Sequence, residues 1–172
     1  YEGTLNVLNL AKSHNSKMLF TSTSEVYGAT QNNPQYENMP INLSTFSSRA
    51  CYSEGKRVAE TLISAFRDTY DLEVRIARIF NTYGPRLNIN DGRVIANFIK
   101  QCFNNEILTI YGNGSQTRSF CYVDDLIEGL TKLMDNNHSF PINLGNNQEI
   151  SIKRLADLIK SKINEKINIE YY

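Results

Sequence analysis

The stretch MLFTSTSEVYG, residues 18–28, decides the fold class. Its start, Met18 to Thr21, is a short apolar run of the kind typical of a buried strand. Hydroxyl-bearing side chains and a glutamate follow at once, so Thr23 and Glu25 are expected at the carboxyl end of that strand. Open α/β sheets bind their ligands at this edge. The stretch therefore predicts an α/β protein with a site beyond the strand.

Helical and strand-like segments alternate on both sides of this stretch. The apolar spacing predicts helices over residues 4–13, 49–70, about 93–103, 123–134 and 151–162, the last capped by Ser151. Strands are expected over residues 18–21, 72–79, 107–111, 141–144 and 167–171. This alternation favours a largely parallel sheet covered by helices. The polar stretch 29–48, with Pro34 and Pro40, is expected to be a long surface loop, and loops of that length are usually functional.

The composition excludes several classes of protein. The 172 residues carry 18 Lys+Arg against 18 Asp+Glu, so no basic surface for nucleic acid is expected. No apolar run approaches the ~20 residues of a membrane span, so no membrane contact is expected in this segment. Three cysteines without CxxC spacing, far from both histidines, argue against a disulfide scaffold and against a metal site. Buried free thiols are expected instead, in a reducing, cytoplasmic compartment.

Residues 52–56, YSEGK, carry the strongest chemical pattern. A Tyr-x-x-x-Lys spacing near the start of a helix places both side chains on one face, about one turn apart. An ammonium beside a phenol favours the phenolate, which then exchanges protons near neutrality. Many helices carry such a pair by chance, and an exposed surface pair is the alternative interpretation.

Six strings combine into a specific resemblance. They are TSTSEVYG (21–28), RACYSEGKRVAET (49–61), ARIFNTYGPR (77–86), NDGRVIANFI (90–99), LTIYGNGSQTRSFCYVDDL (108–126) and INLGN (142–146). In this order they resemble the extended short-chain dehydrogenase/reductase family, and within it the UDP-glucuronate decarboxylases. The resemblance covers nearly the whole chain. It implies an NAD-dependent enzyme built on part of a Rossmann-like doubly wound parallel sheet, with a small α/β substrate-binding region.

The resemblance also implies catalytic roles. Tyr52 would take the proton of the sugar 4-hydroxyl while hydride passes to NAD. Lys56 would bind the nicotinamide ribose and favour the phenolate of Tyr52, and Thr23 would be the hydroxyl partner. Glu25 would assist decarboxylation by disfavouring the neighbouring substrate carboxylate or by positioning water. Besides Tyr52 and Lys56, the predicted cofactor-binding residues are Thr21, Thr82 and Arg93.

The UDP-sugar substrate is assigned its own residues by the same resemblance. Asn81 would contact the diphosphate, and Arg118 would pair with phosphate oxygens through its guanidinium fork. Tyr111 lies in the stretch that brackets the uracil. The predicted substrate-binding set is Asn6, Lys12, Glu25, Asn81, Tyr111 and Arg118.

Ser24 and Glu25 separate the subfamilies. The similar 4,6-dehydratases have the sequence Thr-Asp-Glu at the positions of residues 23–25. Their aspartic acid protonates the leaving hydroxyl, whereas this chain has Ser24 at that position. The 4-epimerases usually lack the glutamate as well. The pair therefore favours decarboxylation of UDP-glucuronate to UDP-xylose through a 4-keto sugar. A hexose 4,6-dehydratase, a 4-epimerase and a catalytically silent dimerising fragment remain the alternatives.

Residues 1–85 are expected to be the C-terminal half of an NAD-binding domain, and residues 86–172 mainly the substrate region. The chain opens inside a predicted helix, and the glycine-rich turn that the family uses for NAD pyrophosphate is not among its motifs. We therefore expect a segment of a longer enzyme, with weak or no activity alone, and an N-terminal anchor in the longer protein is compatible with this. The family also implies a homodimer formed through the helix of residues 49–70. Ser53 stands where the decarboxylases usually have aspartate, which leaves the exact sugar open.

Overall fold

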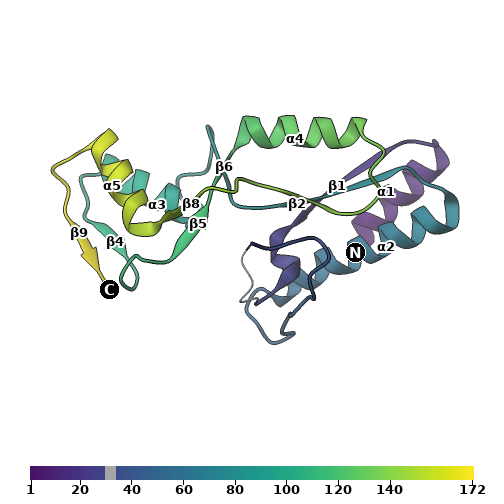
Figure 1. Ribbon diagram of the computed structural model, residues 1–172, viewed down its shortest axis with the longest axis horizontal. Helices are drawn as coiled ribbons and strands as arrows, with labels where there is room; N and C mark the ends of the chain where they lie inside the picture. The colour runs from purple at the N-terminus through teal and green to yellow at the C-terminus, as the bar shows by residue number, and fades with distance from the viewer. Residues whose placement is uncertain (30–33) are drawn as a thin grey trace. The chain divides into compact units, whose positions relative to one another are not determined.

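Three parallel strands form the sheet that positions the candidate site. They are β1 (Met18–Thr23), β2 (Val74–Ile79) and β7 (Ile142–Leu144), in the order β1-β2-β7. Thr23 pairs with Ile79, and Ile79 with Leu144, so the carboxyl ends of all three strands lie at one edge. The structure, a computed structural model, describes residues 1–29 and 34–172 (Figure 1). The sheet belongs to the first of two units, Tyr1–Phe80 with Ile127–Leu144.

Helices cover both faces of this sheet. Figure 1 shows α1 (Glu2–Ser13) and α2 (Ala50–Tyr70) on one face and α4 (Val123–Asp135) on the other. The residues of α4 from Ile127 onward belong to this first unit. In that part of α4, a side chain at Gly129 would meet Leu144 of β7 at 3.4 Å, so the helix packs closely on the strand. The prediction of an α/β fold with a parallel, doubly covered sheet is confirmed.

The core of the first unit follows from helical and strand periodicity. Side chains from α1, α2, β1 and β2 form one buried cluster: Leu8, Ala11, Met18, Ile63, Leu72, Val74 and Ile76. In β2 both faces are covered, since five of its six residues are buried. The alternation of LEVRIARI suggests a strand with one polar face, yet Arg75 and Arg78 are only 3% and 6% exposed. Arg75 donates hydrogen bonds to the Asn136 and Val74 carbonyl oxygens, and the partners of Arg78 are described below.

The segment that follows β1 packs against the rest of the first unit instead of lying wholly on the surface. A 3-10 helix, η1 (Ser24–Tyr27), follows the strand, and its Tyr27 packs with Val26 and Met39 in a second buried cluster. Gly28 has φ +70, and a Cβ there would lie 1.9 Å from the Asn42 carbonyl oxygen, so only glycine fits this close approach. The prediction that residues 29–48 form a surface loop is therefore wrong for Met39, which is 5% exposed; residues 30–33 lie outside the described part.

The second unit, Asn81–Leu126 with Gly145–Tyr172, has its own core. Its strands pair in twos: β3 (Thr82–Tyr83) with β6 (Cys121–Tyr122), β4 (Leu108–Ile110) with β9 (Ile169–Tyr171), and β5 (Thr117–Ser119) with β8 (Glu149–Ser151). Helices α3 (Val94–Phe103) and α5 (Ile152–Ile163) pack on β4 around Phe98, Leu108 and Leu155. Ser151 caps α5 as predicted, since its Oγ accepts a hydrogen bond from the Arg154 amide at 3.1 Å.

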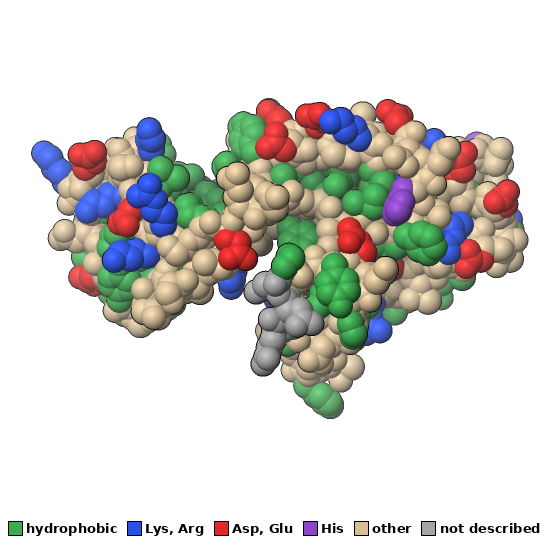
Figure 2. Space-filling model, in the orientation of Figure 1, with side chains coloured by type: hydrophobic (Ala, Val, Ile, Leu, Met, Phe, Trp, Pro, Cys, Tyr) green, Lys and Arg blue, Asp and Glu red, His purple; other side chains and the backbone are tan. Residues whose placement is uncertain are grey.

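The three cysteines differ in burial. Cys102 and Cys121 are buried, whereas Cys51 is exposed, so the expectation of buried thiols is wrong at Cys51. On the face drawn in Figure 2, basic and acidic side chains are interspersed. No helix within the described ranges has the length and apolar character to cross a membrane.

Candidate active site

The carboxyl end of β1 places two predicted residues at the sheet edge. Thr23 is the last residue of β1 and is 8% exposed. Its Oγ1 accepts a hydrogen bond from the Glu25 amide at 3.3 Å, so Thr23 caps η1 while its hydroxyl proton stays available for another acceptor. The turn of η1 then presents Glu25, which is partly exposed.

Helix α2 brings Lys56 onto the same strand. The Lys56 Nζ donates a hydrogen bond to the Thr21 carbonyl oxygen at 2.6 Å and lies 4.8 Å from the Phe20 ring centroid. Burial lowers the pKa of the Lys56 ammonium, because a charged group is partly removed from water. Lys56 is thus docked on β1 near its carboxyl end, unlike the lysine of an exposed surface pair.

Tyr52 lies one helical turn before Lys56, near the start of α2. Its side chain is accessible, since the residue is 43% exposed. The Tyr52 amide donates to the Arg49 carbonyl oxygen at 3.0 Å, which fixes the first turn of the helix. The structure therefore gathers Thr21, Thr23, Glu25, Tyr52 and Lys56 on β1, η1 and the adjoining turns of α2.

Arg49 is a residue of this group that the sequence interpretation missed. Its Nε and Nη2 donate to the two carboxylate oxygens of Glu25 at 2.6 and 2.7 Å. Its guanidinium carbon also lies 5.1 Å from the Tyr52 ring centroid. The hydrogen bond to Glu25 and the charge of Glu25 raise the pKa of Arg49 above its ordinary value. An Arg-Ala-Cys flank alone gives no sign of a partner 24 residues earlier.

A buried polar network supports this edge of the sheet. Arg78 of β2 donates two hydrogen bonds to the Glu60 carboxylate of α2, at 3.1 and 2.7 Å, and one to the Tyr27 hydroxyl at 3.0 Å. The Tyr27 hydroxyl donates in turn to Asn143 Oδ1 at 2.6 Å. Ser22 of β1 donates to Glu60 as well. The network therefore joins α2, all three strands and η1. Because Glu60 lies one turn beyond Lys56, it also fixes the rotation of α2.

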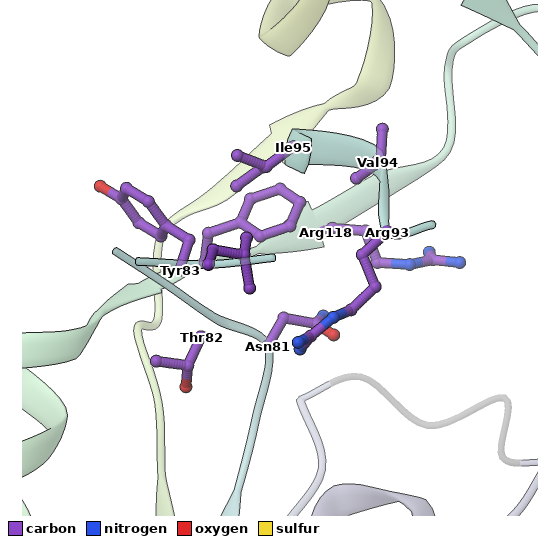
Figure 3. A pocket seen from close by; sticks show the side chains of 9 residues that line it. Asn81, Thr82, Tyr83, Arg93, Val94, Ile95 and Arg118 are labelled. Carbon is purple, nitrogen blue, oxygen red and sulfur yellow. The ribbon is translucent and has the colours of Figure 1, made fainter. Parts of the chain in front are cut away.

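The second unit holds a separate group of predicted residues. Asn81, Thr82, Arg93 and Arg118 line a cavity of about 100 Å³, with apolar walls that include Phe120. Figure 3 shows the Arg93 side chain directed toward Asn81, whereas the Arg118 side chain extends away. Arg93 pairs with Asp91. Asn81 and Arg93 offer an amide and a guanidinium group at this small cavity, which suits an anionic ligand such as a diphosphate, while Arg118 borders it.

Three predicted substrate residues lie apart from these groups. Asn6 is exposed on α1. Lys12 is at the end of α1, with its Nζ 3.5 Å from the centroid of Tyr70, the last residue of α2; this is the end of α2 opposite Tyr52. Tyr111 is 77% exposed beside the Tyr172 ring and does not line the cavity. Both histidines are exposed, and the described residues contain no cluster of metal-ligating side chains.

The class of protein follows from comparison with known families. The NAD dependent epimerase/dehydratase family matches residues 1–145, and the chain belongs to this family. Among curated relatives, UDP-glucuronic acid decarboxylase 3 of Arabidopsis thaliana is 52% identical over 168 residues, which are 98% of this chain and 49% of that protein. UDP-glucuronic acid decarboxylase 1 of Danio rerio is 51% identical over 169 residues, or 98% and 40% of the two chains. The chain thus spans about half the length of these relatives or less.

Solved structures agree with this family. UDP-N-acetylglucosamine 4-epimerase from Methanobrevibacter ruminantium M1, in complex with UDP-N-acetylmuramic acid, has a TM-score of 0.92 and 28% identity over 99% of this chain and 55% of that one. UDP-glucuronic acid 4-epimerase from Bacillus cereus, in complex with UDP-glucuronic acid and NAD, has a TM-score of 0.81 and 27% sequence identity. The match covers 98% of this chain and 52% of that one. The resemblance to nucleotide-sugar enzymes of the extended short-chain family is confirmed.

Proposed function

We propose that this chain carries the acid–base site of an NAD-dependent UDP-glucuronate decarboxylase, which forms UDP-xylose through a 4-keto sugar. The observation that carries the proposal is the group of Thr23, Glu25, Tyr52 and Lys56 at the carboxyl end of β1, where Lys56 is docked on Thr21. The chain is 52% and 51% identical in sequence to two relatives that are named UDP-glucuronic acid decarboxylases. This identity supports UDP-glucuronate as the substrate and decarboxylation as the reaction.

The residues divide the proton chemistry between them. Tyr52 accepts the proton of the sugar 4-hydroxyl, and its exposed ring leaves room for the sugar. Lys56, whose Nζ is held on the Thr21 carbonyl oxygen at 2.6 Å, places a positive charge one helical turn from Tyr52. Thr23 donates its hydroxyl proton to the same sugar oxygen, since its own oxygen already accepts the Glu25 amide.

The chain's residues fit one part of NAD. Lys56 and Tyr52 would hold the nicotinamide ribose near the carboxyl edge of the sheet, with Thr21 beside them. NAD, when bound, supplies the hydride acceptor and afterwards the hydride donor. Within residues 1–29 and 34–172, Gly112 and Gly114 lie between β4 and β5, so their turn lacks the strand-to-helix geometry of a pyrophosphate cradle.

Loss of carbon dioxide follows from the oxidation. A keto group at C4 makes the uronic acid a β-keto acid, which loses its carboxylate as carbon dioxide and leaves an enolate. A proton from water then adds to C5, and Tyr52 later returns its proton to the oxygen at C4. Ser24 cannot serve as the acid that expels a hydroxyl, which disfavours dehydration. Asn81 and Arg118 are the proposed contacts to the diphosphate, which provides binding energy remote from the reacting carbon, whereas Thr82 and Arg93, which line the same cavity, are the proposed cofactor contacts. Asn6, Lys12 and Tyr111 have less structural support as substrate contacts.

The test is product analysis with several nucleotide sugars. The purified full-length protein that contains this chain, given NAD and UDP-glucuronate, should release carbon dioxide and form UDP-xylose. UDP-glucose and dTDP-glucose, in parallel reactions, should give neither a dehydrated nor an epimerised sugar. Formation of a 4-keto-6-deoxy sugar would assign a dehydratase instead.

Assembly and compartment are further parts of the proposal. We infer a homodimer in which α2 packs on its copy, because Val58 is 42% exposed and Ala65 is also accessible on that helix. The free thiols Cys51, Cys102 and Cys121 favour a reducing, cytoplasmic compartment. Sedimentation of the protein tests the first inference, since a monomer at micromolar concentration contradicts it.

A further inference from the structure

The Arg49–Glu25 pair has an arrangement that the proton chemistry above does not use. Both carboxylate oxygens of Glu25 accept hydrogen bonds from the Arg49 guanidinium. The pair is open to solvent, with 65% of the Arg49 side chain and 38% of the Glu25 side chain exposed. Exposed ion pairs contribute little to stability, so the fold does not depend on this contact.

The position of Arg49 relative to Tyr52 limits what the guanidinium can reach. Its guanidinium carbon lies 5.1 Å from the centroid of the Tyr52 ring. A sugar whose 4-hydroxyl contacts the Tyr52 hydroxyl carries its C5 substituent on the neighbouring carbon. In a uronic acid that substituent is a carboxylate, which a planar guanidinium binds through two parallel hydrogen bonds.

We propose that Arg49 is a specificity-determining residue that binds the carboxylate of the sugar in competition with Glu25. This inference rests on the proposed function and names a group in this chain that favours uronic acids over neutral sugars. When the carboxylate of the sugar takes the guanidinium, one carboxylate replaces the other on Arg49, and the Glu25 carboxylate, which is 38% exposed, turns to water. A neutral hydroxymethyl group offers no such replacement and leaves Arg49 bound to Glu25.

Competition with Glu25 also has a consequence for the rate. A carboxylate held firmly in the ground state is harder to release as carbon dioxide, because only interactions that strengthen in the transition state accelerate a reaction. Glu25 weakens the hold of Arg49 on the substrate without removing recognition. Glu25 therefore affects turnover by sharing the guanidinium.

Calorimetric binding of two sugars tests this assignment. UDP-glucuronate and UDP-glucose are titrated into the NAD-loaded protein and into the variants Arg49→Gln, Arg49→Lys and Glu25→Gln. Arg49→Gln should weaken UDP-glucuronate binding about tenfold and change UDP-glucose binding less than about twofold. Arg49→Lys keeps the charge but loses the fork, so its loss should be intermediate. Glu25→Gln should strengthen UDP-glucuronate binding and lower kcat.

The matched control is Glu54→Gln, which removes the Glu54–Arg57 pair on the surface of the same helix. Its binding of both sugars should equal that of the unaltered protein. Equal weakening of both sugars by Arg49→Gln, or unchanged UDP-glucuronate binding, overturns the assignment. Weaker UDP-glucuronate binding in Glu25→Gln overturns the competition.

The proposed function can fail separately from this inference. If the unaltered protein binds UDP-glucuronate but releases no carbon dioxide, the decarboxylase assignment fails, while the affinity ratios still decide the role of Arg49. If the unaltered protein binds neither sugar, the Arg49 assignment is overturned as well.

Discussion

Removal of Arg78 should destabilise the first unit by about 3–5 kcal/mol, the cost of leaving one partner of a buried ion pair uncompensated. The side chains of Arg78 and Glu60 are only 7% and 11% exposed. Arg78→Leu would remove two hydrogen bonds to Glu60, one to the Tyr27 hydroxyl and one to the Glu37 carbonyl oxygen. Burial lowers the pKa of Arg78, but the bonds from Glu60 and Tyr27 outweigh burial, so the net pKa is raised.

The expected fall in Tm distinguishes the buried Arg78–Glu60 pair from ion pairs on the surface. For a chain of this length, about 3–5 kcal/mol corresponds to a fall in Tm of about 6–20 °C. Glu60→Gln keeps an acceptor for Arg78 and for Ser22, so its fall in Tm should be smaller. The control is Lys132→Met, which removes the exposed Lys132–Glu128 pair and should leave Tm unchanged within error.

The assay is thermal unfolding followed by circular dichroism, repeated with urea. The double variant Arg78→Leu/Glu60→Leu should recover part of the loss, because two apolar side chains replace both members of the pair. A fall in Tm for Arg78→Leu no larger than that for Lys132→Met would refute the argument that this network holds α2 on the sheet.

Four further perturbations test the described contacts. Tyr52→Phe should abolish NADH formation with UDP-glucuronate while changing UDP-glucuronate affinity less than about threefold, because one hydroxyl is lost; turnover above one-tenth of the unaltered rate would contradict its acid–base role. In the native protein a thiol reagent should modify exposed Cys51 first, and fast modification of Cys102 would contradict its burial. Burial raises the folded-state pKa of Cys102, so the unfolded state loses its thiol proton first and stability should fall above about pH 8.5; Cys102→Ala should reduce that slope in urea unfolding. Arg118→Gln should weaken UDP binding about tenfold, and unchanged affinity would exclude it as a phosphate contact.

The periodic elements of the chain were predictable from the sequence because local pattern determines them. The strand at Met18 and the long helix that starts at Ala50 were found within a few residues, since apolar spacing reports which face is covered. Ser151 was found as a cap because capping is a local interaction. The short strand Thr117–Ser119 was missed: it has three residues, is mostly exposed and pairs with a segment 30 or more positions away.

Partners distant in sequence explain the rest of what was missed. The buried state of Arg78 depends on Glu60 and Tyr27, which lie 18 and 51 positions away. Arg49 likewise gains its significance only from Glu25 across a loop. The substrate-binding role of Lys12 rested on the family resemblance alone. Lys12 lies far from Tyr52 because the end of α1 packs on Tyr70, the last residue of α2, whereas Tyr52 is near the start of that helix.

The most direct test of the decarboxylase proposal uses UDP-glucuronate labelled with ¹³C at the carboxyl carbon. With NAD present, the protein should release labelled carbon dioxide in an amount equal to the UDP-xylose formed. The Tyr52→Phe variant should release none above background. Formation of an epimerised, still labelled UDP-sugar without carbon dioxide would contradict the account.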